Sequence, residues 1–250
     1  MKIKFASISK QGIKKHVNQD CFAVPLSEHN TQKKGFLFVV CDGVGGYKGG
    51  EIASKMCCKI FMNDFYAKEN INNISDWLEH EIKIINNEIV AQGIKLGNAN
   101  MSTTLVSLIL KENTAYLNNV GDSRIYIFTD DKLEQVTEDH SVVWKYYKQG
   151  LITKDEIIQS KKKHLITEAL GLNTQPKINE YQIKLSEKFL FLLCTDGLTD
   201  VCKDSEIENV LKQNKNLEST IEELYNLSQK NGSRDDVTMV LIKNNTREIR

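Results

Sequence analysis

Residues 39–46 read Val39-Val40-Cys41-Asp42-Gly43-Val44-Gly45-Gly46. They join an apolar run over 36–41, which predicts a buried strand, to a glycine-rich loop and a helical pattern that begins near Glu51. A buried strand holds an acid at its end in a fixed place, and the glycine after that acid lets a backbone carbonyl approach a ligand. Asp42 and Gly43 could therefore offer two oxygens to a hard cation. The alternative is a hairpin turn, which Asp-Gly between apolar runs also indicates.

Composition narrows the class of protein. The chain has 250 residues, enough for a sizeable core, and 33 acidic and 33 basic side chains give a formal net charge of zero. The charges are interspersed, so we expect neither nucleic-acid nor membrane-surface binding. No apolar stretch approaches the ~20 residues of a spanning helix, and the basic N-terminus lacks the apolar segment of a signal peptide. We therefore expect a cytoplasmic protein.

The six cysteines support that location. None forms a Cys-x-x-Cys pair, so a zinc site is disfavoured, and most lie in or beside apolar runs. We expect them to be reduced, as in a reducing cytoplasm. The sequence shows no linker, internal repeat or low-complexity tract. We expect one domain over residues 1–245 and a short tail at 246–250.

The pattern of elements predicts an α+β fold. Strands are predicted at 3–8, up to Val24, 36–41, 103–110, 114–119, 124–128, 132–136, 178–185, 189–194 and 237–242. Helices are predicted from Glu51, after Ser75 as N-cap, and at 140–149, 204–212 and 217–229. The tight turns between 103 and 136 favour one antiparallel meander. Because regular βαβ alternation is missing, antiparallel sheets covered by helix pairs fit better than a parallel sheet.

Four aspartates share a sequence context. Asp42 and Asp196 each end a predicted buried strand and precede glycine, Asp122 lies in a Gly-Asp-Ser turn, and Asp235 precedes the last strand. Each has an ordinary interpretation as a turn or cap residue. Gathered at one end of a sheet, however, their carboxylates would repel one another unless cations held them together.

Eight short motifs in a fixed order resemble the metal-dependent protein phosphatases of type 2C, in particular their bacterial-type branch. They extend over nearly the whole chain, from Gly12 to Thr238. The motifs are Gly12-x-x-Lys15-x-x-Asn18-Gln19-Asp20, Asp42-Gly43-Val44-Gly45-Gly46, Met101-Ser102-Thr103-Thr104, Gly121-Asp122-Ser123-Arg124, Thr137-Glu138-Asp139-His140-Ser141, His164-x-x-Thr167-x-x-x-Gly171, Thr195-Asp196-Gly197-Leu198-Thr199-Asp200 and Asp235-Asp236-Val237-Thr238.

The resemblance implies a central sandwich of two antiparallel β-sheets flanked by helix pairs, with a metal site at one end. It implies that Asp42 bridges two metal ions and that the Gly43 carbonyl binds one of them. Asp196 and Asp235 would complete the ligands of the first ion.

The resemblance also implies a supporting acid and a third ion. Asp20 would hold metal-bound waters without touching a metal, and Asp122, Asp196 and Asp200 would form the third metal site. Oxygen ligands with many waters suit Mg²⁺ or Mn²⁺ and not zinc.

The implied reaction is hydrolysis of phosphoserine or phosphothreonine on a protein. In the mechanism that the resemblance implies, two metal ions would lower the pKa of a shared water, and the resulting hydroxide would attack phosphorus in line without a covalent intermediate. Phosphoproteins would be the substrates, a cognate Ser/Thr kinase is a possible partner by analogy, and we expect a monomer.

The sequence departs from the family at several positions. Lys15 stands where the family usually has Arg, which keeps the positive charge but loses the bidentate fork for phosphate; Lys14 could substitute for it. Val44 stands where the eukaryotic branch has His, so a metal-bound water is expected to protonate the leaving group. His164 is a candidate substrate-side group or a structural residue, and His140 is interpreted as structural.

Other departures remove no ligand. Ser102 replaces a usual Gly at little expected cost, and Asp236 replaces a common Asn and would add negative charge near the metals. Residues 142–163 correspond to the family's variable flap. Its aromatic residues could line a substrate groove, but packing within the flap is favoured; they are Trp144, Tyr146 and Tyr147.

Two other functions compete with an active phosphatase. A pseudophosphatase would bind phosphoproteins or regulate a kinase, which Lys15 weakly favours and the complete set of acids disfavours. A nucleotide-binding loop is disfavoured, because Lys48 precedes Gly49-Gly50 and neither common glycine-rich pattern is matched.

Overall fold

The computed structural model describes residues 1–25, 34–44, 49–213 and 216–244. Gly45, Gly46, Lys48 and the expected tail at 246–250 lie outside the described residues. No helix in the described ranges is long and apolar enough to cross a membrane.

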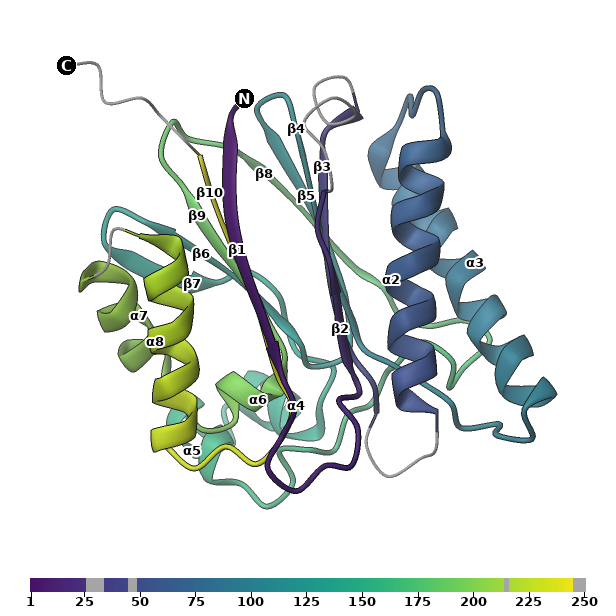
Figure 1. Cartoon of the computed structure of the whole chain (residues 1–250). Coiled ribbons are helices and arrows are strands. Elements are labelled where there is room, and N and C mark those ends of the chain that lie inside the picture. The colour runs from purple at the N-terminus through teal and green to yellow at the C-terminus, as the bar shows by residue number, and fades with distance from the viewer. Residues whose placement is uncertain (26–33, 45–48, 214–215, 245–250) are drawn as a thin grey trace.

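The fold is a sandwich of two five-stranded antiparallel sheets, which confirms the predicted α+β class (Figure 1). The first sheet has the order β1 (Ile3–Lys10), β10 (Val237–Asn244), β9 (Leu190–Cys194), β6 (Arg124–Thr129) and β7 (Lys132–Gln135). The second has the order β2 (Asp20–Ala23), β3 (Phe36–Asp42), β4 (Leu105–Lys111), β5 (Thr114–Val120) and β8 (Asn179–Lys184).

Two helix pairs cover the outer faces of the sandwich (Figure 1). Helices α2 (Gly50–Ala67) and α3 (Ile74–Lys95) lie on the second sheet, and α7 (Asp204–Gln213) and α8 (Leu217–Lys230) lie on the first. The short helices α4 (Val142–Lys148), α5 (Lys154–Gln159) and α6 (Asp196–Thr199) gather at the end of the sandwich opposite the N-terminus (Figure 1).

Strand β3 shows why the apolar run before Asp42 is continuous. Leu37, Val39 and Cys41 pack under the α2–α3 pair. Phe38 and Val40 point the other way, into the layer between the two sheets. Because both faces of the strand are buried, no alternation of polar residues is needed.

The predicted meander over residues 103–136 was wrong. The hairpins β4–β5 and β6–β7 form, but they belong to different sheets. The chain crosses between the sheets at Gly121-Asp122-Ser123, where Gly121 has φ 105°, a left-handed conformation that favours glycine. The crossing places Asp122 at the end of the sandwich.

Local capping differs from the prediction at one helix. Asn73, and not Ser75, caps α3, and its side chain accepts from the backbone N–H groups of Ser75 and Asp76. Asparagine is as strong an N-cap as serine, so the helix begins two residues earlier than expected.

The aromatic residues of segment 142–163 pack mainly within it. Trp144 is 8% exposed and contributes to a small apolar cluster with Val143 and Ile157, against which Tyr147 packs. Tyr146 lies under the Lys162 ammonium, 5.7 Å from the ring centroid. These contacts support the prediction that the aromatic residues pack within the segment and do not line a substrate groove.

Candidate active site

A cavity of about 350 Å³ opens at the end of the sandwich where several strands stop. The predicted acids Asp42, Asp122, Asp196 and Asp235 all line it. Asp42 ends β3, Asp122 lies at the crossing between sheets, Asp196 begins α6 directly after β9, and Asp235 comes just before β10. The other lining residues are Lys15, Val44, Thr104, His164 and Ile166.

Two threonines fix the backbone of Asp42. The N–H of Asp42 donates to Oγ1 of Thr104 (2.9 Å), and its carbonyl accepts from the Thr104 N–H (2.8 Å) and the Thr103 hydroxyl (2.8 Å). The Thr104 hydroxyl also pairs with that of Ser123 (2.7 Å), next to Asp122. This network gives the Ser-Thr-Thr motif a physical role that sequence alone could not assign.

The hairpin interpretation of Asp42-Gly43 was wrong, because β3 pairs with β2 and β4 and the chain continues toward α2. Glycine is required at 43 by close packing: a Cβ there would lie 2.4 Å from the carbonyl of Gly50. Gly197 is required for the same reason, since its Cβ would lie 2.0 Å from the carbonyl oxygen of Asp236. Each Asp-Gly pair thus lets a second backbone segment approach the acid.

The clustered carboxylates raise one another's pKa values. Burial is the largest cause of a raised pKa at Asp42 and Asp122, and neighbouring aspartates add to it. Burial, followed by Asp200 and Asp235, raises the pKa of Asp196 to about 7. Like charges this close disfavour joint ionisation unless a cation compensates them.

Unpaired oxygens indicate that the site suits cations. Among the described residues, Oδ1 of Asp20 and Oδ1 of Asp196 are buried and have no hydrogen-bond partner. Such atoms are costly without a compensating donor or ion. Carboxylate oxygens are the donors that Mg²⁺ and Mn²⁺ prefer. The donor chemistry therefore suits the predicted ions, although the ligand atoms of Asp42, Asp196 and Asp235 do not all lie within 4.8 Å of one another.

Asp20 lies behind the cavity and not on its wall. It is the register partner of Asp42 and is 5% exposed, and its Oδ2 accepts from the Thr195 hydroxyl (3.0 Å). Burial is the main reason that its pKa rises to about 8. This location is compatible with a role through water.

Lys15 reaches the cavity from the loop between β1 and β2. Its Nζ lies 2.6 Å from Oδ1 of Asp235. Lys14 is exposed and does not line the cavity, so it does not replace Lys15.

Asp236 holds that loop. Its Oδ1 accepts from the Gly12 N–H and its Oδ2 from the Gln19 N–H, each at 2.8 Å. Both carboxylate oxygens of Asp236 accept from backbone donors, and the residue does not line the cavity. We therefore interpret Asp236 as an anchor for the loop and not as added charge for the cations.

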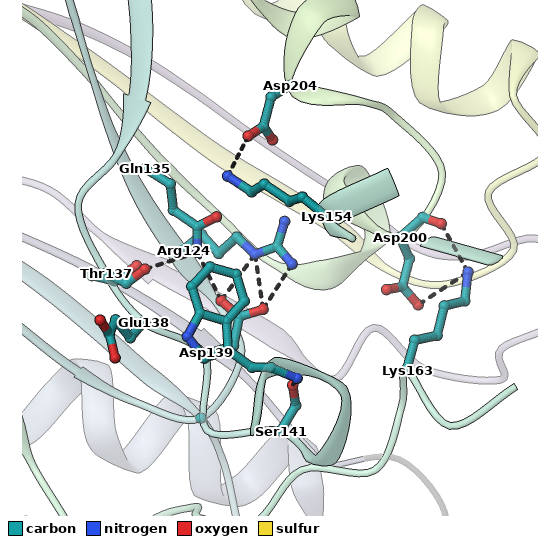
Figure 2. Close-up of polar contacts among 12 residues, drawn as sticks. Arg124, Gln135, Thr137, Glu138, Asp139, Ser141, Lys154, Lys163, Asp200 and Asp204 are labelled. Carbon is teal, nitrogen blue, oxygen red and sulfur yellow. Dashed lines mark hydrogen bonds and ion pairs between the residues drawn. The ribbon is translucent and has the colours of Figure 1, made fainter. Parts of the chain in front are cut away.

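His164 and Asp200 meet at the rim. His164 Nδ1 lies 2.9 Å from Oδ2 of Asp200, and this hydrogen bond is the main reason that the His164 pKa is raised. Together with Asp196, the two residues offer ligand atoms within 4.8 Å of one another. Figure 2 shows Lys163 reaching Asp200, where its Nζ donates to the backbone carbonyl (2.8 Å). Asp200 itself does not line the cavity.

A buried Arg124–Asp139 ion pair links the site to segment 142–163 (Figure 2). The Arg124 guanidinium donates from two nitrogens to Asp139 at 2.7–3.0 Å and lies 5.9 Å from the Trp144 ring centroid. Lys154 stands at the same distance from that ring and pairs with Asp204 of α7 (2.6 Å). Sequence reasoning missed this network, because nothing local pairs residues so far apart.

His140 supports the same region. Its side-chain Nδ1 accepts from the Gly121 N–H (3.2 Å), and its backbone N–H donates to the Gly121 carbonyl (2.8 Å). These bonds fix the turn before Asp122 and support a structural role.

Comparison with known proteins identifies the family. Residues 11–241 match the family model for protein phosphatase 2C. The chain is 29% identical over 235 residues to the serine/threonine phosphatase stp of Listeria welshimeri, covering 92% of each protein. It resembles the crystal structure of Stp1 from Staphylococcus aureus with a TM-score of 0.89 and 30% identity, covering 98% of this chain and 96% of that one. The catalytic domain of the phosphatase PstP, solved with two manganese ions, matches with a TM-score of 0.80 and 28% identity, covering 96% and 97%. The chain therefore belongs to the protein phosphatase 2C family of enzymes.

Proposed function

We propose that this phosphatase hydrolyses phosphoserine and phosphothreonine on proteins and depends on Mg²⁺ or Mn²⁺. The observation that carries the proposal is the cavity in which four aspartates and Lys15 face one another. Asp42, Asp196 and Asp235, with the Gly43 carbonyl, would hold two cations, and Asp122, Asp196 and Asp200 a third. When bound, the cations would activate water and neutralise charge on the phosphoryl oxygens.

The described lining residues disfavour a phosphoenzyme formed on serine, threonine or cysteine. No serine or cysteine lines the cavity in the described part of the chain, and its one hydroxyl, that of Thr104, is engaged with Asp42 and Ser123. The described part of the cavity therefore offers no free hydroxyl or thiol that could form a covalent phosphoenzyme.

The chain's other groups would act on the substrate and the water. Lys15 would attract the phosphate dianion, with Asp235 released to a cation from the contact seen here. Oδ1 of Asp20, which has no partner, would accept a hydrogen bond from a water beneath the acids. His164 stands at the mouth, where it could meet the substrate. Residues 142–163 would form a flap beside that mouth, and a cognate kinase would supply the phosphoproteins.

Phosphate release from a phosphothreonine peptide tests the proposal. The chain is first stripped with EDTA, then assayed with no metal, with Mg²⁺ and with Mn²⁺. We expect no turnover without metal and turnover with at least one ion. A folded, metal-loaded chain that binds the peptide but releases no phosphate would instead be the non-enzymatic binding module.

A further inference from the structure

Four of the six cysteines lie together behind the strands that carry Asp20 and Asp42. Cys21 and Cys41 are register partners in the β2–β3 pair, next to the Asp20–Asp42 pair. Because neighbouring side chains on a strand point to opposite faces, the cysteines face away from the acids. Both pack into the apolar layer under α2.

Helix α2 brings two more thiols to the same layer. Cys57 and Cys58 pack there, and the Cys58 thiol interacts with those of Cys21 and Cys41. Cys41, Cys57 and Cys58 are buried, whereas Cys21 is partly exposed. An oxidant in solution therefore reaches Cys21 first, and Cys58 is the thiol in contact with it.

We propose that Cys21 and Cys58 are a site of reversible oxidation that forms a disulfide between β2 and α2. With hydrogen peroxide as oxidant, the Cys21 sulfur attacks one peroxide oxygen, the O–O bond breaks, and a sulfenic acid and water result. The Cys58 sulfur then attacks the Cys21 sulfur, and the S–O bond breaks to release a second water. The two thiols lose two electrons and two protons, and the peroxide is reduced to two waters.

A soft metal is the other chemistry that four thiols could serve, but the geometry disfavours it. Within the described ranges, the one group of three histidine, cysteine or acidic residues whose ligand atoms lie within 4.8 Å of one another is His164, Asp196 and Asp200. No three cysteine sulfurs meet that condition. Contact between two cysteines, of which Cys21 is accessible, suits a disulfide better than a metal site with three or four thiolate ligands.

The disulfide would fasten the strand that starts at Asp20 to the helix behind it. It encloses residues 21–58, including β3 and Asp42. The disulfide would therefore lie one residue from Asp20, the register partner of Asp42, although its formation does not depend on phosphatase activity.

Thiol counting and peptide mapping test the site in the intact chain. After hydrogen peroxide and its removal, we expect the denatured protein to have lost two of its six thiols, with one disulfide-linked peptide pair containing Cys21 and Cys58. Dithiothreitol should restore all six. The mapping uses the wild-type chain, so it does not rely on any variant folding.

Two serine variants provide the matched comparison. Cys21→Ser should lose no thiols under the same treatment. Cys202→Ser, which removes a buried thiol packed against the first sheet, should still lose two. Retention of all six thiols by the wild type, a disulfide joining other cysteines, or oxidation of Cys21 to sulfinic acid without a disulfide would overturn the proposal.

Discussion

Asp235 and Asp236 are sequence neighbours, but we expect replacement of Asp236 to reduce stability and replacement of Asp235 to reduce activity. Asp236 is 2% exposed and accepts two backbone N–H groups, from Gly12 and Gln19, at 2.8 Å each. Alanine would leave both donors without an acceptor, and each such loss costs about 1 to 3 kcal/mol. We therefore expect Asp236→Ala to lower the free energy of unfolding by about 2 to 5 kcal/mol.

Asp235→Ala should have little effect on stability. The Asp235 side chain is 40% exposed, and its ion pair with Lys15 lies in the range where such pairs contribute about 0 to 1 kcal/mol. Removing one of several mutually repelling carboxylates offsets part of that loss. If Asp235 binds a cation, however, this variant should lose phosphatase activity.

Urea unfolding followed by circular dichroism measures both variants. EDTA is kept in the buffer, so that metal binding does not contribute to the stability of the wild type. An Asp236→Ala protein within ~0.5 kcal/mol of the wild type, or one more stable than Asp235→Ala, would refute the anchoring role.

Three further predictions concern the phosphate group, the acids and the helix pair. Lys15→Arg should lower KM for a phosphothreonine peptide about fivefold at similar kcat, because guanidinium binds two phosphate oxygens; an unchanged or higher KM counts against this. Thr104→Val removes the acceptor for the Asp42 N–H and should weaken Mn²⁺ binding about tenfold in calorimetry, whereas wild-type affinity would contradict the positioning role. Glu81 is buried, and burial, followed by the neighbouring Asp64 carboxyl group, raises its pKa from 4.5 to about 7. The folded state therefore keeps a proton that the unfolded state releases, and stability declines between pH 4.5 and 7. Between these pH values, the free energy of unfolding of Glu81→Gln should fall by about 1 to 3 kcal/mol less than that of the wild type. A variant with the same pH profile as the wild type would exclude the effect.

The fold class and the acid cluster could be predicted because their signals are local. Asp42 and Asp196 each follow an apolar run that must be a buried strand, and antiparallel strands with helix pairs leave few arrangements for their ends. Asp122 and Asp235 border strands in the same way. The family resemblance then predicted that these ends lie together, as the cavity shows.

The rest depends on contacts between distant residues. The turns within β4–β5 and β6–β7 have the same local pattern whichever sheet each hairpin joins, so the crossing at Gly121 could not be seen. Asp236 lies beside a predicted metal ligand, yet its partners are backbone groups more than 200 positions away. Likewise, the pairing of Arg124 with Asp139 under Trp144 needs the tertiary fold.

The most direct test of the central claim compares phosphate release from a phosphothreonine peptide by the wild type and Asp42→Ala at saturating Mn²⁺. Glu88→Ala, which removes an exposed carboxylate from α3, is the matched control. We predict turnover by the wild type and the control and none by folded Asp42→Ala, because Asp42 would bridge both cations. Turnover by Asp42→Ala near the wild-type rate would contradict a metal-dependent reaction centred on this residue.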